Sequence, residues 1–279
     1  LFNQQTTVPH LLRNVVKHIH PATNTFLIRK TGNTWEEISF ETTLDNADAI
    51  SSYFLEAGIN KGDRLAFIIE NCPEYVYYDQ ALQQIGCINT SIYPTLSEAE
   101  IEYILLDSGA KTILVGSPFL LKKVIKIANH CPDLIRIIPV FNDFQKITEK
   151  AVLNAGVLSL DQVIEEGKNK LNNYSTQIDA LRASVMPSDI SSLIYTSGTT
   201  GVPKGVMLSH QNIYSNVMFS KESFPFEDAP DSKVLSFLPL NHIFEKMVTY
   251  IYLYSGISIY YAESLETMIA AAGGPAVEA

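Results

Sequence analysis

The chain of 279 residues contains only three cysteines, Cys72, Cys87 and Cys131. An odd number without the paired spacing of a metal site does not make a disulfide framework, so we expect buried thiols in a reducing compartment. Long hydrophobic runs are also lacking. The longest apolar stretch covers residues 247–262, is interrupted by threonine, serine and glycine, and is shorter than the roughly 20 residues of a membrane-spanning helix. We interpret it as a buried helix followed by a buried strand.

Basic residues are few: 20 lysines and arginines stand against 30 acidic residues, which gives a net charge of −10. This balance argues against a protein that follows a nucleic acid backbone, although a local site can still hold a small anion. The first residues show no basic region followed by an apolar block, which predicts no signal peptide and a cytoplasmic location. With 46% hydrophobic and 18% charged residues, the composition is that of a globular protein.

Short apolar segments rich in β-branched residues alternate with longer segments of helical periodicity. Buried strands are predicted at residues 65–69, 112–115, 135–141, 190–195, 234–238 and 257–261. Helices are predicted at 45–55, 74–85 and 98–107, each followed by a glycine suited to a left-handed C-cap: Gly58, Gly86 and Gly109. The alternation predicts α/β architecture with parallel sheet. Segment 142–188 is more polar and less periodic, and we interpret it as a connection between two α/β halves.

The segment 194–206 carries the clearest chemical signal. Three glycines free the backbone to present its N–H groups to an anion, and four hydroxyls stand within five residues: Thr196, Ser197, Thr199 and Thr200. Lys204 adds a positive charge on a flexible stem. Apolar segments on both sides predict a strand–loop–strand unit, not a Walker loop, which opens a helix. An ordinary surface turn of similar composition is the alternative.

Residues 196–205, Thr-Ser-Gly-Thr-Thr-Gly-Val-Pro-Lys-Gly, closely resemble the phosphate-binding signature of the adenylate-forming superfamily, which includes acyl-CoA synthetases, firefly luciferases and peptide-synthetase adenylation domains. Residues 237–245, Phe-Leu-Pro-Leu-Asn-His-Ile-Phe-Glu, resemble a second signature in the form typical of the long-chain fatty acyl-CoA synthetase branch. Weaker similarity at 34–38, 61–66, 86–97 and 260–264 extends the resemblance over about 34–268, the AMP-binding region of that family.

The resemblance implies an α/β fold: the large N-terminal domain of an adenylate-forming enzyme, with two doubly wound sheets flanked by helices and incomplete at its C-terminus. Residues 1–268 are then a partial adenylation domain with a sub-boundary within 142–188. Residues 269–279 form an atypical small-residue tail. The family's adenine-side, ribose-binding and C-terminal lid segments would all lie downstream, so the resemblance implies little ligase activity for this chain alone.

The implied activity is that of a ligase of fatty acid metabolism with two half-reactions. A long-chain fatty acid attacks ATP to give an acyl-adenylate, and CoA then takes the acyl group. In this chain the phosphates of ATP would be held by Thr196, Ser197, Gly198, Thr199, Thr200, Gly201 and Lys204. Thr196 matches the hydroxyl nearest Mg²⁺, and His242 matches the position beside the reacting carboxylate. His242, Thr196 and Lys204 are therefore the candidate catalytic residues.

Two alternatives stay open: an adenylating enzyme for an aryl or amino acid, and a non-catalytic nucleotide- or acyl-binding fragment. The expected partners are fatty acid, ATP and CoA, without nucleic acid, and a long-chain substrate is compatible with peripheral membrane contact. Oligomeric state cannot be read from the sequence.

Several further side chains allow two readings. Glu245 either pairs with His242 or a neighbouring helix, or is a solvated acid. His18 and His20 would share one face of a strand, yet no third metal ligand is evident, and His210 is explained by helix capping. Tyrosines at 75, 77 and 78 are read as core or surface aromatics, and the aromatics at 244, 250, 252 and 254 as acyl-channel lining or core.

Overall fold

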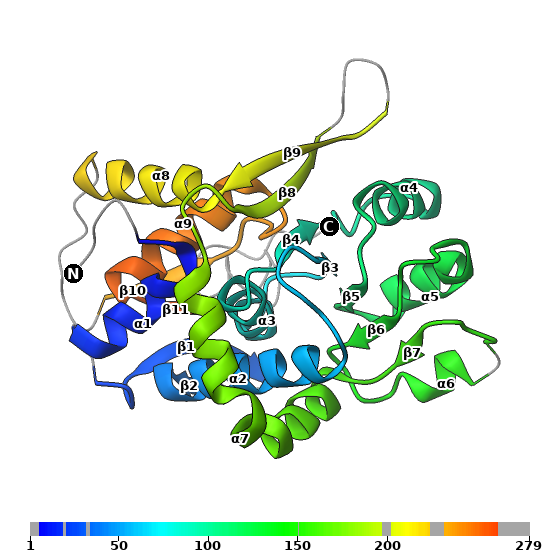
Figure 1. Ribbon diagram of the computed structural model, residues 1–279, viewed down its shortest axis with the longest axis horizontal. Helices are drawn as coiled ribbons and strands as arrows, with labels where there is room; N and C mark the ends of the chain where they lie inside the picture. The colour runs from blue at the N-terminus through cyan, green and yellow to red at the C-terminus, as the bar shows by residue number, and fades with distance from the viewer. Residues whose placement is uncertain are drawn as a thin grey trace, which may run out of the picture.

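The computed structural model describes residues 6–18, 21–31, 34–149, 151–196, 202–223 and 232–261. Two sheets organise these residues (Figure 1). The smaller sheet has the order β10-β11-β1-β2, formed by Lys233–Ser236, Ser258–Tyr261, Thr25–Thr31 and Thr34–Ser39. The larger has the order β7-β6-β5-β3-β4-β8-β9, formed by Gly156–Val157, Arg136–Pro139, Thr112–Val115, Arg64–Ile68, Ile88–Ser91, Ile190–Thr196 and Lys204–Ser209.

Both sheets are parallel except at one edge each, where β1 pairs with β2 and β8 with β9 in antiparallel fashion. The α-helices that flank them are α1 Val8–His18, α2 Phe40–Glu56, α3 Pro73–Gln84, α4 Glu98–Ser108, α5 Pro118–Ile127, α6 Gln145–Thr148, α7 Leu160–Ser184, α8 His210–Ser223 and α9 Ile243–Ser255. A short 3₁₀ turn, Ala128–His130, follows α5. The predicted α/β architecture with parallel sheet is confirmed. None of the described helices is long and apolar enough to cross a membrane.

Alternation along the central strands divides the interior into two cores. Leu65 and Phe67 of β3 pack into a core shared with α1, α2, α3, α7 and α9, whereas Ala66 and Ile68 face a second core under α4 and α5. Successive side chains of a strand point to opposite faces, and a strand that is apolar on both faces is buried on both. The apolar runs in the sequence therefore mark the strands that lie between helical layers.

The predicted elements occur close to their expected positions. Gly58, Gly86 and Gly109 all have positive φ, at 79°, 70° and 60°. Gly109 is the C-cap of α4 and donates its N–H to the last turn of that helix, as a left-handed cap does. The apolar stretch 247–262 is helix α9 followed by strand β11, as expected.

Segment 142–188 differs from its sequence interpretation. It contains α7, a helix of 25 residues that begins with a capping box at Ser159 and Gln162. The chain leaves the larger sheet at β7 and re-enters it at β8, so the segment connects two strands of one sheet and does not separate two α/β halves. The prediction missed the helix because its exposed face is polar along most of its length, which weakens the apolar periodicity on which the prediction depended.

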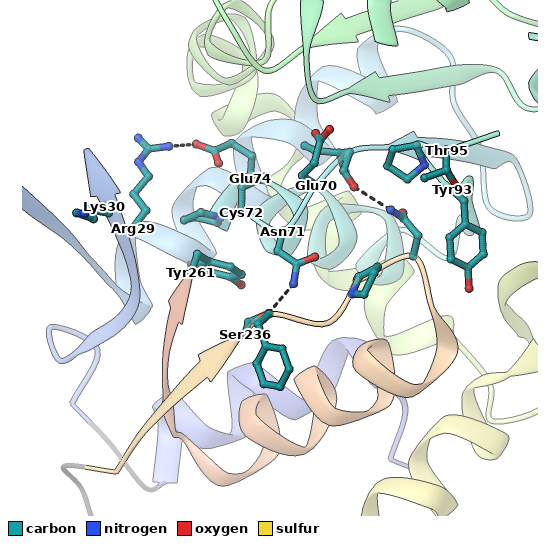
Figure 2. A pocket seen from close by; sticks show the side chains of 16 residues that line it. Arg29, Lys30, Glu70, Asn71, Cys72, Glu74, Tyr93, Thr95, Ser236 and Tyr261 are labelled. Atoms are coloured by element: carbon teal, nitrogen blue, oxygen red, sulfur yellow. Dashed lines mark hydrogen bonds and ion pairs between the residues drawn. The ribbon is translucent and has the colours of Figure 1, made fainter. Parts of the chain in front are cut away.

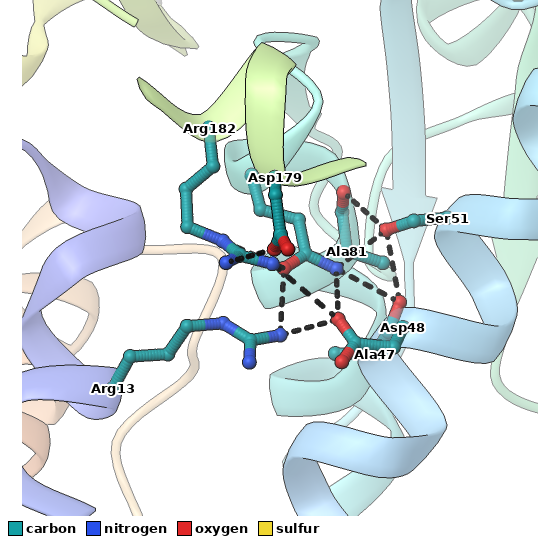
Figure 3. A network of polar contacts seen from close by, with 8 residues as sticks. Arg13, Ala47, Asp48, Ser51, Ala81, Asp179 and Arg182 are labelled. Carbon is teal, nitrogen blue, oxygen red and sulfur yellow. Dashed lines mark hydrogen bonds and ion pairs between the residues drawn. The ribbon is translucent and has the colours of Figure 1, made fainter. Parts of the chain in front are cut away.

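Helix α7 lies unusually close to α2. A Cβ atom at Gly167 would fall 1.9 Å from the carbonyl oxygen of Ala49, so glycine is required where the two backbones approach. Figure 3 shows a polar network that ties four helices together nearby. Gln84 of α3 accepts from Arg13 of α1 and Arg182 of α7, both at 2.9 Å, and donates to Asp48 of α2 at 2.9 Å.

Candidate functional site

A cavity of about 470 Å³ opens at the carboxyl ends of β3, β4, β10 and β11 (Figure 2). Ligands of open parallel sheets bind in crevices at this end of the strands. Residues that follow three of these strands line it, including Asn71 after β3, Tyr93 after β4 and Phe237 after β10. The second signature segment, 237–245, therefore begins in a cleft between the two sheets.

Asn71 fixes this segment in place. Its Nδ2 donates to Ser236 Oγ at 2.9 Å and to the carbonyl of Leu238 at 2.6 Å, and its Oδ1 accepts from the N–H of Leu240 at 2.9 Å. The nitrogen and the oxygen of one side-chain amide thus both form hydrogen bonds to a segment more than 160 residues further along the chain. Asn71 was not predicted as a site residue, because no local pattern of residues predicts a hydrogen bond over that separation.

Two further buried contacts brace the segment. Asn241 Nδ2 donates to the carbonyl of Ile69 at 2.8 Å, and Ser236 Oγ donates to Glu245 Oε1 at 2.8 Å. Burial raises the pKa of Glu245, and the serine contact opposes the rise. Both readings of Glu245 offered by the sequence are wrong, since it is a buried acid that pairs with Ser236 and neither a partner of His242 nor a solvated group.

His242 is the N-cap of α9, and its Nδ1 accepts from the N–H of Phe244 at 3.1 Å. A neutral imidazole that accepts at Nδ1 carries its proton on Nε2. The imidazole is exposed and meets the ring of Tyr93 edge-on, with centroids 6.4 Å apart. Its position beside the cleft leaves the imidazole accessible to a ligand.

The other two candidate catalytic residues lie on the hairpin of β8 and β9. Thr196 and Lys204 are cross-strand partners at its outer end, and both are exposed. The hairpin extends away from the body of the molecule (Figure 1), and the strand–loop–strand prediction is confirmed. Five predicted phosphate-binding residues lie outside the described residues: Ser197, Gly198, Thr199, Thr200 and Gly201.

Strand pairing relates the hairpin to the cleft. Ser91 at the end of β4 is in register with Ile194 of β8, and Tyr93, two residues further on, carries the ring that contacts His242. Tyr195 anchors the hairpin by donating to Asp107 at 2.6 Å. Within the described ranges, no hydrogen bond, ion pair or ring contact joins His242 directly to Thr196 or Lys204.

A buried charged network between α3, β4 and α9 was not predicted. Asp79 of α3 accepts from Asn89 at 2.7 Å and from the hydroxyl of Tyr250 at 2.7 Å, and Lys246 Nζ lies 3.8 Å away. Burial lowers the pKa of Lys246 to about 8. Lys246 and Tyr250 share one face of α9 at the i, i+4 spacing, which was the available signal. The network joins α3, β4 and α9 under the segment that positions His242.

The remaining histidines have structural surroundings. His18 ends helix α1 and does not lie on a strand, and His20 falls outside the described residues. No group of metal-ligating side chains occurs in the described part of the chain. His210 is fully buried at the start of α8 and accepts from the N–H of Val8 at 3.4 Å, whereas Ser209 supplies the capping oxygen.

Most of the aromatic residues left open by the sequence are core. Tyr75, Tyr77 and Tyr78 are buried, as are Tyr250 and Tyr254. Phe244 differs because 59% of its side chain is exposed, and Tyr252 is partly buried against the core. The cysteines are free thiols; two are buried and Cys72 is half-buried at the cleft.

Comparison with known proteins decides the family. Residues 17–272 match the family described as AMP-binding enzyme. The chain belongs to the AMP-binding enzyme family. Fatty acyl-CoA synthetase A of Dictyostelium discoideum is 31% identical to this AMP-binding chain over 225 residues, which cover 78% of this chain and 31% of the relative. The chain thus spans about a third of the length of that relative.

Solved structures support the same family at the level of fold. A long-chain-fatty-acid–CoA ligase from Archaeoglobus fulgidus matches with a TM-score of 0.77 at 20% identity, covering 98% of this chain and 50% of that one. A second match is the A domain of a carboxylic acid reductase from Segniliparus rugosus, in complex with AMP and a co-purified carboxylic acid. Its TM-score is 0.75 at 17% identity, and the match covers 95% of this chain and 46% of that one. The chain therefore has the fold of about half of each of these two proteins.

Proposed function

We propose that this chain is part of an ATP-dependent long-chain fatty acid–CoA ligase that forms an acyl-adenylate and then an acyl-CoA. The observation that carries the proposal is the hairpin of β8 and β9, which places Thr196 opposite Lys204 at the two ends of a loop rich in glycine and hydroxyl side chains. Relatives about 30% identical include a fatty acyl-CoA synthetase and a long-chain-fatty-acid–CoA ligase, which favours a long-chain fatty acid over other carboxylates.

The residues fit a negatively charged phosphate chain. Lys204 is exposed and its ammonium is available as a point charge for phosphate oxygens. Loop N–H groups and hydroxyls at 196–201 would supply further donors. Mg²⁺ keeps several waters and phosphate oxygens and needs only one or two protein ligands, so the exposed hydroxyl of Thr196 suffices as its protein contact. When bound, the metal neutralises charge on the phosphates.

In this proposal His242 acts on the carboxylate. Because its Nδ1 is occupied by the N–H of Phe244, Nε2–H is the group that donates a hydrogen bond to a carboxylate or phosphoryl oxygen. Asn71 and the buried Ser236–Glu245 contact hold the segment on both sides of it. Positioning of this kind lowers the barrier by fixing the reacting groups before reaction.

Calorimetric titration with MgATP tests the phosphate site. We expect Lys204→Ala to weaken binding at least tenfold, because a charge-assisted contact is lost. The matched control is Lys122→Ala, which removes an exposed lysine of α5 and should leave binding unchanged. Equal affinity of wild type and Lys204→Ala would show that the hairpin does not hold the phosphates.

The substrate class needs a separate measurement. ATP–pyrophosphate exchange with the protein expressed from its full open reading frame should be stimulated by palmitate more than by benzoate or phenylalanine. Stimulation by benzoate or phenylalanine instead would establish the alternative, an enzyme that adenylates an aryl or amino acid. MgATP binding without exchange on any acid would establish a non-catalytic nucleotide-binding protein.

A further inference from the structure

A second cavity, of about 410 Å³, lies at the opposite edge of the larger sheet from the cleft. Its walls come from the last turns of α2, the middle of α7 and the first residue of β6, Arg136. Because the cleft lies at the carboxyl ends of the parallel strands and Arg136 at an amino end, the two cavities are separate. None of the residues assigned to phosphate or carboxylate chemistry lines this second cavity.

Arg136 enters the cavity without an ion-pair partner among the described residues. Its guanidinium carbon lies 5.9 Å from the centroid of the Tyr53 ring, an arrangement typical of cation–π contact. In the part of the chain that the structure describes, no carboxylate reaches it within the 4.0 Å of an ion pair. A Cβ atom at Gly156 would lie 2.0 Å from Arg136 Nη1, so the neighbouring strand leaves room for the guanidinium to take this position.

Tyr53 contributes a second unsatisfied group. Its side chain is 6% exposed, and no hydrogen bond of good geometry from the described residues reaches the hydroxyl, although the Arg136 guanidinium lies close enough to oppose the rise in pKa that burial causes at Tyr53. A buried donor left unpaired is costly, so an acceptor that enters the cavity gains both the hydroxyl and the guanidinium. Beside these groups the wall is apolar, formed by the ring of Tyr53 with Ala57 and Leu158.

The other charges limit the kind of anion. Lys170 is already neutralised by Glu56 at 2.8 Å, and Glu56 also accepts from the hydroxyl of Tyr174 at 2.5 Å. Glu166 lines the cavity and adds a negative charge there. Because Glu166 balances much of the charge of Arg136, the cavity disfavours a polyanion such as a phosphate ester. The selection of a carboxylate then depends on the geometry of the guanidinium.

We propose that this cavity binds an organic monocarboxylate. The carboxylate is held by the forked guanidinium of Arg136, which matches it in a bidentate way, and by the hydroxyl of Tyr53. A compact hydrocarbon or ring packs on Ala57, Leu158 and the face of Tyr53. Asn169 at the cavity wall adds an amide that can hydrogen-bond a polar substituent.

Octanoate and 3-phenylpropionate, kept below micellar concentrations, are the probes. Calorimetry should give saturable binding that Arg136→Met weakens at least tenfold and Tyr53→Phe weakens severalfold, and methyl NMR should show a shift of the Leu158 methyl groups on addition of either probe. Ala57→Leu, which fills the apolar part of the cavity, should weaken binding while leaving Arg136 in place. Lys122→Met is the charge-matched control and should bind as wild type does.

Circular dichroism and thermal unfolding identify any variant that fails to fold. If Arg136→Met fails to fold, the binding measured for Ala57→Leu and the shift of the Leu158 methyl signals in wild type together test the proposal. Inorganic phosphate should produce no comparable shift. Binding that is unchanged in Arg136→Met and Ala57→Leu, or that leaves the Leu158 methyl signals unmoved, would overturn the proposal. A carboxylate bound in the cleft behaves in that way, so failure here leaves the proposed ligase function intact.

Discussion

The imidazole of His242 meets the ring of Tyr93 edge-on, with ring centroids 6.4 Å apart. The contact joins the N-cap of α9 to the loop that follows β4, two segments about 150 residues apart in the chain. It places the candidate catalytic imidazole against a residue that lines the cleft. His242 caps α9, and the proposed function gives it a second role, as a donor to substrate.

Substitutions at His242 should separate these roles. His242→Ala removes the acceptor for the N–H of Phe244 and should lower the free energy of unfolding by about 1 kcal/mol. His242→Asn keeps a capping oxygen and should be nearly as stable as wild type in urea denaturation. Both should lose pyrophosphate exchange in the full open reading frame. Full exchange activity in His242→Asn would leave His242 with only its capping role.

Asn71→Ala should destabilise the cleft. It removes three hydrogen bonds to the segment 236–240 and leaves the N–H of Leu240 unpaired, which costs about 1–3 kcal/mol. Urea unfolding measures the loss. Asn172→Ala on the exposed face of α7 is the matched control, and an equal effect of the two substitutions would contradict the role given to Asn71.

Gly167→Ala tests the close approach of α7 to α2. The added methyl would lie 1.9 Å from the carbonyl oxygen of Ala49, and a helical backbone cannot yield as a flexible side chain does. Overpacking costs about 1–3 kcal/mol, more than the roughly 1 kcal/mol of helix propensity that alanine gains over glycine. Denaturant unfolding should therefore show a net loss of stability. Ser175→Ala, exposed on the same helix, should show none.

His210 should make stability depend on pH. Burial is the main cause that lowers its pKa to about 4; the charge of Lys61 lowers it further, and that of Asp189 opposes the change. The imidazole therefore stays neutral in the folded chain while the unfolded chain takes up a proton below about pH 6.5. The contribution of His210 to the free energy of unfolding is complete above about pH 6.5. It is lost as pH falls toward about 4, at up to about 1.4 kcal/mol per pH unit.

Urea unfolding of wild type and His210→Asn at pH 7, 6 and 5 measures this effect. Asparagine keeps an acceptor for the N–H of Val8 but does not titrate, so the stability difference between the two proteins should shrink as the pH falls. Parallel curves over this range would mean that His210 is not the group responsible.

Local signals in the sequence predicted much of the fold. Apolar β-branched runs marked β3, β5, β6 and β8 of the larger sheet, and the glycines after three helices have the positive φ expected of them. Helix α7 was missed because most of its residues face solvent, and its stability depends on packing against α2 at Gly167. A helix that is stabilised mainly by packing against another helix shows only a weak helical pattern in its own sequence.

The site shows the same division. The hydroxyl-rich order of residues 196–205 and the motif around His242 were visible in the sequence, and the family they indicated is confirmed. The Asn71 contacts, the burial of Glu245 and the Asp79–Lys246 pair were not visible. A charged or amide side chain has the same sequence signature whether it lies in water or in the core, so only its neighbours decide which.

The sequence by itself determined most strands of the larger sheet, several of the helices and the family to which the turn at 196–205 points, because backbone preference and short motifs act over a few residues. Tertiary structure decided that β4 lies beside β8, that the loop after β3 holds the segment at His242, and that Arg136 enters a second cavity without an ion-pair partner among the residues that the structure describes. These relations join residues about 80 to 170 positions apart, and they arise only when the whole chain packs and excludes water.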